Sequence, residues 1–166
     1  MEAAIQAQGA TSARQLLRHT LATLAYRTAK AVRGTPESFA IFSAGANART
    51  PAQIVAHLGD LMDWALAIAK GAPTWRNSTP LPWTEEVERF FRALRAFDDY
   101  LASDQPLACS MDKLFQGPVA DALTHTGQIN ILRRMSGSPV KGENYFRAEI
   151  VTGCVGQEQT APKLES

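Results

Sequence analysis

The segment that decides the fold reads Asp121-Ala-Leu-Thr-His125-Thr-Gly-Gln128-Ile, in which a carboxylate, an imidazole and an amide interrupt an apolar helical pattern. At 100° per residue, four apolar residues lie within about 60° of His125: Pro118, Ala122, Ile129 and Leu132. The spacing therefore predicts a helix with His125 at the centre of its buried face, flanked by Asp121 and Gln128. Because a buried polar group costs free energy unless it has a partner, this face is predicted to carry a polar site.

This helix is predicted to open at Gly117-Pro118 and to end at Ser136-Gly137-Ser138-Pro139, because glycine and proline stop a helix. Gly127 lies in its middle, where glycine costs about 1 kcal/mol relative to alanine. We therefore expect close packing against Gly127.

Three earlier segments have apolar residues at helical spacing: 12–32, 51–70 and from Thr84 to Pro106. The second has the clearest start, since Thr50 suits the N-cap, Pro51 the first helical position, and Gln53 completes a capping box. Gly71 is a suitable stop, and Thr84 is the expected cap of the third helix. A single turn is expected near 111–115. Four amphipathic helices predict an all-α four-helix bundle.

The composition indicates one globular domain at 1–155, with an ordered loop at 140–155 that includes a short strand, and a disordered tail at 156–166. The net charge of +1 argues against nucleic acid or an anionic membrane as partner, and no apolar run approaches the roughly 20 residues that span a bilayer. No signal peptide is evident. The spacing of Cys109 and Cys154 suits neither a disulfide nor a metal site, so we expect a cytoplasmic protein with reduced thiols.

His57 adds a second inward-facing imidazole. It lies about 80° from the centre of the apolar stripe of its helix, on the shoulder of the buried face, with Asp60 further round as a supporting or alternative ligand. Asp121 and His125, one turn apart, can converge on one point. Two interpretations stay open: Asp121 orients a hydrogen-bonded core histidine, or His57, Asp121 and His125 bind a metal ion. His19 is expected on the surface.

The residues Thr50-Pro-Ala-Gln-Ile-Val-Ala-His57-Leu and His125-Thr-Gly-Gln128-Ile, on the second and fourth helices, resemble the DinB-like superfamily over residues 12–137. These are bacterial four-helix metalloproteins related to thiol-dependent S-transferases and maleylpyruvate isomerase. The resemblance implies His57 and His125 as metal ligands. The family's H-x-x-x-H pair has Asp121 at its first position here. Two interpretations follow. Asp121 replaces that histidine, and the resulting ligand set of two histidines and one carboxylate suits Zn or Ni and also Fe or Mn. Alternatively, the metal site has decayed.

Three protein ligands leave coordination positions open, which is typical of a catalytic metal site. The segment 141–149 is expected to fold over it, with Tyr145 and Asn144 as hydrogen-bond donors to a small-molecule substrate and Glu143 or Glu149 as a base or extra ligand. An ordinary surface loop is the alternative.

The resemblance implies a metal-dependent transferase or isomerase that uses a low-molecular-weight thiol as cosubstrate. The alternatives are a metal-dependent hydrolase, and a non-catalytic module that binds a small ligand or serves a stress response. The resemblance also implies a homodimer, and the tryptophans Trp64, Trp75 and Trp83 are candidates for its interface.

Overall fold

The regular structure of the chain is entirely helical in the computed structural model, which describes residues 2–163 and 165 and, from residue 12 onward, their side chains. The four long helices are α1 (Glu2–Val32), α2 (Pro51–Ala69), α3 (Trp83–Ala102) and α5 (Ala120–Met135). The short ones are the 3₁₀-helix η1 (Glu37–Ile41), α4 (Met111–Leu114) and the π-helix η2 (Phe115–Val119). The predicted all-α fold is confirmed.

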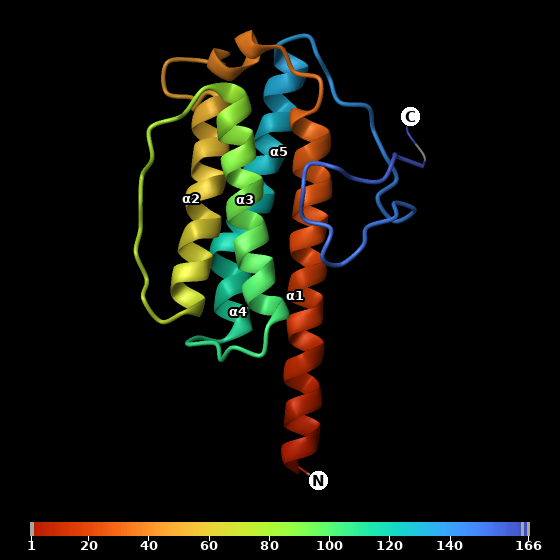
Figure 1. Cartoon of the computed structure of the whole chain (residues 1–166). Helices are drawn as coiled ribbons and strands as arrows, with labels where there is room; N and C mark the ends of the chain where they lie inside the picture. The colour runs from red at the N-terminus through yellow and green to blue at the C-terminus, as the bar shows by residue number, and fades with distance from the viewer. Residues whose placement is uncertain (1, 164, 166) are drawn as a thin grey trace.

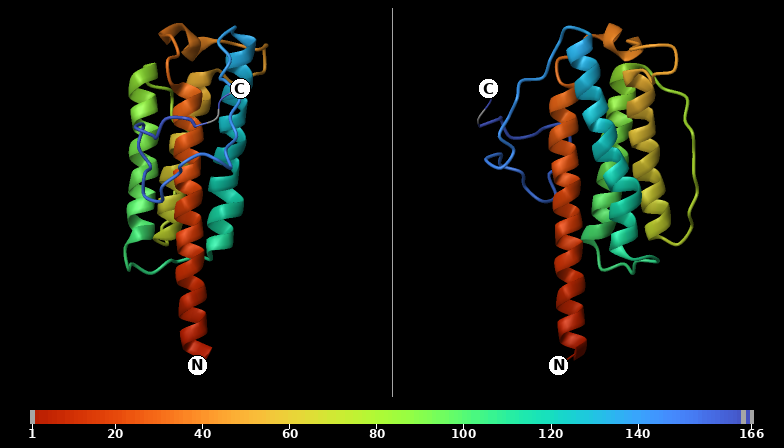
Figure 2. Two further views of the ribbon diagram at one scale, coloured as in Figure 1. Left: turned by 90° about the vertical axis from the view of Figure 1, so that its right-hand side faces the viewer. Right: turned by 180° about the vertical axis from the view of Figure 1, so that it is seen from behind.

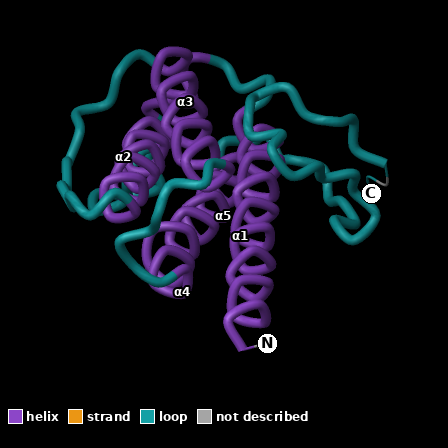
Figure 3. Tube along the Cα trace, turned by 60° about the horizontal axis from the view of Figure 1, so that its bottom comes forward, coloured by secondary structure: helices purple, strands orange, loops and turns teal. Residues whose placement is uncertain are grey.

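The long helices lie side by side (Figure 1). α2 contacts α3, α3 contacts α1, α1 contacts α5, and α5 contacts α2, so the four helices close a ring around the core. The largest fully buried side chains include Leu21, Leu24, Ile54, Leu58, Phe90, Phe97 and Ile129. The N-terminal end of α1 extends beyond the other three helices (Figure 2). Figure 3 views the helices with the N-terminal end of α1 brought forward. α2 and α5 contact each other, and the face that they share carries the candidate site.

The capping box predicted for α2 is confirmed. The Thr50 hydroxyl accepts a hydrogen bond from the Gln53 amide at 3.3 Å, and the Thr50 amide donates to Gln53 Oε1 at 2.9 Å. Gly71 ends the helix with φ +78°, a conformation that favours glycine. These two signals fix the length of α2 and place His57 in its second turn.

The predicted cap of α3 is wrong by two residues, because the N-cap is Pro82 and not Thr84. The helix begins at Trp83, and Thr84 is already inside it. Trp83 is drawn into the helix because its indole is buried, packs edge-on against Phe39 at 5.8 Å, and donates to Thr35 Oγ1 at 2.9 Å. No side chain caps the helix, but the buried Glu86 carboxylate holds the preceding chain by accepting a hydrogen bond from the Leu81 amide at 2.7 Å.

The fourth long helix does not open at Gly117-Pro118, as predicted. α4, η2 and α5 follow one another without a break from Met111 to Met135. Pro118 has no amide hydrogen, and its ring would clash with the carbonyl four residues earlier in an α-helix. The wider π turn accommodates the proline, so the helix continues. The predicted end is confirmed by Ser136 at the C-cap and by Gly137 with φ +80°.

The chain after α5 runs back along α1 (Figures 1 and 2). The strand expected in 140–155 is absent from the described residues, where the sole bridge joins Glu143 to Glu165. Residues 156–163 and 165 contain no helix or strand, and their predicted disorder stays a prediction. None of the described helices is long and apolar enough to cross a bilayer.

Candidate metal centre

His57 of α2 and the pair Asp121 and His125 of α5 come together where these two helices face each other. Each residue offers one ligand atom, and the three atoms lie within 4.8 Å of one another. His57 Nε2 is 3.3 Å from Asp121 Oδ2, and His125 Nδ1 is 3.1 Å from Asp121 Oδ1. The two imidazole rings meet edge to face with centroids 4.6 Å apart. The structure therefore brings together the three residues that the sequence selected.

The cluster lies nearer the surface than the sequence predicts. The His57 and His125 side chains are 14% and 12% exposed, but that of Asp121 is 44% exposed. The buried face of α5 is centred on Ala122, Thr126 and Ile129, so His125 lies on its shoulder and not at its centre. Solvent can therefore reach the carboxylate, and burial alone does not require a cation beside it.

Two further expectations for this segment are wrong. Gln128 is exposed and takes no part in the cluster. A Cβ atom added to Gly127 would meet nothing within 4 Å, so Gly127 does not allow a close approach of a neighbouring element.

The hydrogen bonds of His125 define its tautomer. Nδ1 lies 3.0 Å from the backbone carbonyl oxygen of Asp121, and Nε2 lies 3.2 Å from the guanidinium Nη1 of Arg49. The carbonyl can only accept and the guanidinium can only donate, so Nδ1 carries the hydrogen and Nε2 the lone pair. A carbonyl that fixes Nδ1–H is the usual support of a histidine that binds metal through Nε2. In this structure Arg49 occupies that lone pair.

The environment of His57 favours its neutral form. Burial lowers the pKa of His57 below its ordinary value of 6.5, and the neighbouring His125 lowers it further, against the opposing effect of Asp121. The ring also packs edge to face on Trp75, with centroids 5.7 Å apart, and Trp75 packs on Trp64 in turn. A neutral imidazole has the lone pair that metal binding requires.

Asp60, the alternative ligand, is committed elsewhere. Its buried carboxylate accepts hydrogen bonds from the amide and hydroxyl of Ser78, at 2.8 and 2.7 Å, and from Arg89 Nη1 at 3.1 Å. Arg89 reaches across α2 from α3 and also donates to Glu86 and to the carbonyl of Ala56. Asp60 therefore ties the loop at 71–82 to the helices beside His57, and it is not a candidate ligand.

Two open cavities adjoin the cluster. One, of about 420 Å³, extends from His57 past Arg49 and Gln53 to the loop at 77–80. The other, of about 460 Å³, lies beside Asp121 and is lined by Trp64 and the π-helical residues Gln116 and Gly117 among others. The cluster therefore adjoins one cavity at His57 and another at Asp121.

The loop residues expected at the site lie away from it, and Glu143 and Tyr145 pack against α1. Both oxygens of the Glu143 carboxylate are engaged by α1, with Tyr26 Oη and Lys30 Nζ each at 2.6 Å. Tyr145 packs edge to face on Tyr26, with centroids 6.3 Å apart. Asn144 is exposed and accepts from the amide of Phe146.

Glu149 is likewise exposed and pairs with Lys163. The structure therefore does not bring Tyr145, Asn144, Glu143 or Glu149 to the cluster, and their catalytic roles stay untested predictions.

Two residues that the sequence did not select contact the cluster: Arg49 and Trp75. Both lie in connections without helical periodicity, so helical angles carry no information on them. His19 is exposed as expected, with Nδ1 3.1 Å from the hydroxyl of Thr152.

Comparison of the chain with protein families, with curated proteins and with solved structures gives no match. The resemblance to the DinB-like superfamily therefore rests on the residues quoted above, and the function is argued from the site.

Proposed function

We propose that this chain is a divalent-metal-dependent enzyme of the DinB-like type, in which His57, Asp121 and His125 bind the metal. The observation that carries the proposal is the convergence of one ligand atom from each residue within 4.8 Å, from two helices that lie side by side. Two imidazoles and a carboxylate suit zinc, nickel, iron and manganese, with zinc and nickel preferred.

The chemistry of the residues fits such an ion. Burial favours the neutral form of His57, and the bond to a backbone carbonyl fixes the orientation of the His125 ring. Three protein ligands leave coordination positions open. A divalent ion in such a site supplies Lewis-acid chemistry, because it polarises a carbonyl or promotes deprotonation of a water or thiol.

The chain's own residues would hold the substrate. Arg49 and Gln53 line the cavity beside His57 and offer donors to a carboxylate or carbonyl group of a small molecule. Trp75 packs edge to face on the His57 ring and would lie beside a bound molecule. Arg49, which now bonds to His125, would be free to bond to the substrate if His125 were to hold a metal.

The proposed reaction is a transfer or isomerisation that uses a low-molecular-weight thiol, as the resemblance implies. Metal-dependent hydrolysis is the alternative. Turnover of candidate substrates with and without added thiol distinguishes them, since thiol dependence is expected in the first case only.

One observation favours a second candidate, a non-catalytic module that binds a small ligand. His57, Asp121 and His125 already bond to one another or to Arg49, so each of the three has a hydrogen-bond partner without a cation. Such a protein would bind its ligand in the adjoining cavities without metal.

The decisive experiment measures bound metal by elemental mass spectrometry in tag-free protein, as purified and after reconstitution with Zn, Ni, Mn or Fe(II). We expect about one ion per chain in the wild type, and its loss in His57→Ala, Asp121→Ala and His125→Ala. His19→Ala is the matched control, because this histidine is exposed and outside the cluster. Circular dichroism confirms that each variant is folded. No metal after reconstitution would refute the enzyme proposal and favour the module.

We also propose a cytoplasmic homodimer. Trp83 is buried in the core and cannot serve an interface, whereas Trp75 is 48% exposed and can. Light scattering of wild type and Trp75→Ala tests this state, and a monomeric wild type would contradict it.

A further inference from the structure

A third cavity, of about 580 Å³, lies between α1, α5 and the loop at 140–145. Its lining includes Thr23, Arg27, Asn130, Arg134, Lys141 and Tyr145. On α5, Asn130 and Arg134 lie about 140° and 180° from His125 around the helix. This α1–α5 cavity is therefore separate from the candidate metal centre, which faces α2.

The cavity holds an excess of positive charge. Arg27, Arg134 and Lys141 line it, and the acidic residue in the lining is Glu143. The Glu143 side chain is completely buried, and both of its oxygens bond to Tyr26 and Lys30. Lys30 thus neutralises the Glu143 carboxylate. A second carboxylate, that of Glu165, pairs with Lys30 at 3.0 Å and with Lys141 at 4.0 Å, which leaves the two arginines of the lining unbalanced.

Two polar atoms at this cavity have no partner. Within the described part of the chain, the buried side-chain nitrogen and oxygen atoms without a hydrogen bond are Arg27 Nε and Asn130 Oδ1. Among the described residues the guanidinium of Arg27 forms no ion pair, and it lies over the ring of Tyr145, 4.0 Å from the ring centroid. Native proteins rarely leave such atoms unpaired, and an exception commonly indicates a bound water, ion or ligand. Both exceptions lie at one cavity.

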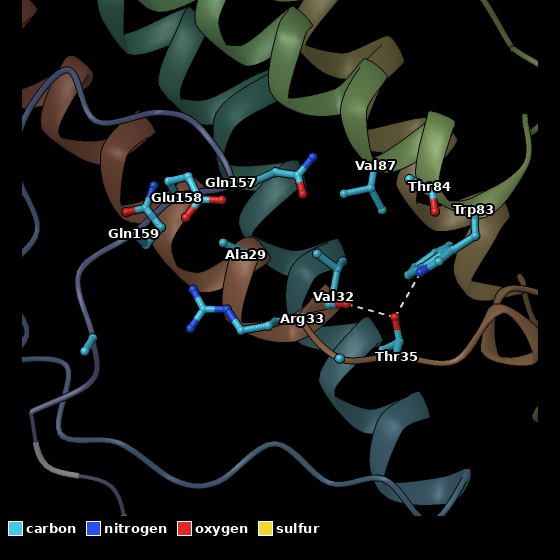
Figure 4. Close-up of a pocket in the computed structure, with 12 residues that line it drawn as sticks. Ala29, Val32, Arg33, Thr35, Trp83, Thr84, Val87, Gln157, Glu158 and Gln159 are labelled. Atoms are coloured by element: carbon cyan, nitrogen blue, oxygen red, sulfur yellow. Dashed lines mark hydrogen bonds between the residues drawn. The ribbon is translucent and has the colours of Figure 1, made fainter.

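A different cavity shows the contrast. It has a volume of about 500 Å³ and lies between the end of α1, the start of α3 and the tail (Figure 4). There Trp83 donates to Thr35, and Thr35 donates to the carbonyl of Val32. Its lining has one cationic residue, Arg33, and one acidic residue, Glu158, and neither of the two unpartnered buried atoms found among the described residues lies in it.

We propose that the α1–α5 cavity is a binding site for a small organic oxyanion, a carboxylate or a phosphate ester. A guanidinium binds both groups through paired N–H donors. Arg27 is the principal anchor, with Arg134 at the rim, and the amide of Asn130 contributes a donor after rotation. The site is independent of the metal centre, so its ligand is an additional substrate group or an effector.

The test measures the melting temperature and, by calorimetry, the affinity of the wild type for malonate, inorganic phosphate and chloride at matched ionic strength. At a concentration of about 100 times Kd, an oxyanion should raise the melting temperature by about 5 to 10 °C, and chloride should not. Malonate and phosphate separate the carboxylate from the phosphate preference. No effect of either oxyanion beyond that of chloride overturns the proposal, and leaves water as the occupant.

Variants make the test specific. Arg27→Met should lower the affinity at least tenfold, since it removes a charge-assisted hydrogen-bond pair. The matched control Arg92→Met removes an exposed positive charge on α3 and should leave the affinity unchanged. Equal losses in both variants would mean that net charge alone is measured, which overturns the proposal.

A structural role for Arg27 predicts a different result. In the absence of ligand, Arg27→Met should leave the melting temperature unchanged or raise it, because it removes a buried unpaired group. A clear decrease would show that Arg27 serves the fold instead. Gly127→Gln should block the cavity by filling space that is open above Gly127, whereas Gly127→Ala should not. His57→Ala should bind the oxyanion as the wild type does, which separates this site from the proposed metal function.

Discussion

Substitution of Gly59 by alanine tests how firmly the network around Arg89 holds α2 to α3. In an ordinary helix interior this change stabilises by about 1 kcal/mol. Here a Cβ atom on residue 59 would lie 2.8 Å from both Cζ and Nη2 of Arg89, where ordinary contacts begin at 3.4 Å. The guanidinium must move by about 0.6 Å (3.4 − 2.8) to make room. It is held by Glu86, Asp60 and the carbonyl of Ala56, so it cannot move without losing bonds.

The expected cost follows from the burial of the partners. Glu86 and Asp60 side chains are 0% and 1% exposed, and disruption of a buried ion pair costs about 3 to 5 kcal/mol. Arg89 itself is 15% exposed, which favours the lower end. Subtracting the gain in helix propensity leaves a net destabilisation of about 2 kcal/mol, or about 4 to 8 °C in melting temperature for a domain of this size.

Urea denaturation followed by circular dichroism measures this difference, and a double-mutant cycle identifies its cause. Arg89→Lys keeps a cation for the carboxylates but removes the three atoms that crowd Gly59. In that background Gly59→Ala should stabilise by up to about 1 kcal/mol. If Gly59→Ala stabilises the wild type as well, the guanidinium is free to move and the reasoning is wrong.

Three further predictions concern the site and the thiols. Burial lowers the pKa of His57 in the folded protein, so the unfolded chain binds that proton more readily. The metal-free protein should therefore be most stable above pH 6.5 and lose stability as the pH falls below it, and thermal denaturation should show a smaller loss of stability in His57→Gln than in His19→Gln. Arg49→Met should raise the affinity for zinc about tenfold in competition with a chelator, since a charged hydrogen bond to His125, about 1.5 kcal/mol, no longer competes; a weaker affinity would show that Arg49 supports the metal. Burial raises the pKa of Cys109 above 9.0, so in Cys154→Ser the folded protein should react with iodoacetamide at pH 8 more slowly than the urea-unfolded protein, and equal rates would contradict this.

The helices were predictable where a local signal sets them. Thr50, Gln53 and Gly71 act through contacts within a few residues, and the structure has them as predicted. The start of α3 was missed because the buried Trp83 depends on Phe39 and Thr35, more than forty residues away in sequence. A local pattern cannot include such a partner.

The site shows the same division. Helical angles predicted that His57, Asp121 and His125 face one another, as the structure has them, because the direction of a side chain from its own helix is a local property. The angles did not show how deep His125 lies, since depth depends on where α2 packs. The segment at 143–145 was placed over the wrong helix, because Glu143 is captured by Tyr26 and Lys30, which are 117 and 113 residues away.

The π turn at Phe115–Val119 makes the site tolerant of a change in chain length. A π turn has one residue more than an α turn for the same turn of the helix, so it amounts to an insertion absorbed within a continuous helix. Deletion of one residue there would restore α geometry and leave everything after it close to its present phase. Asp121 and His125 would then still face His57. By contrast, deletion of one residue from the regular α-helix between Asp121 and His125 would turn one of them away from the other by about 100°.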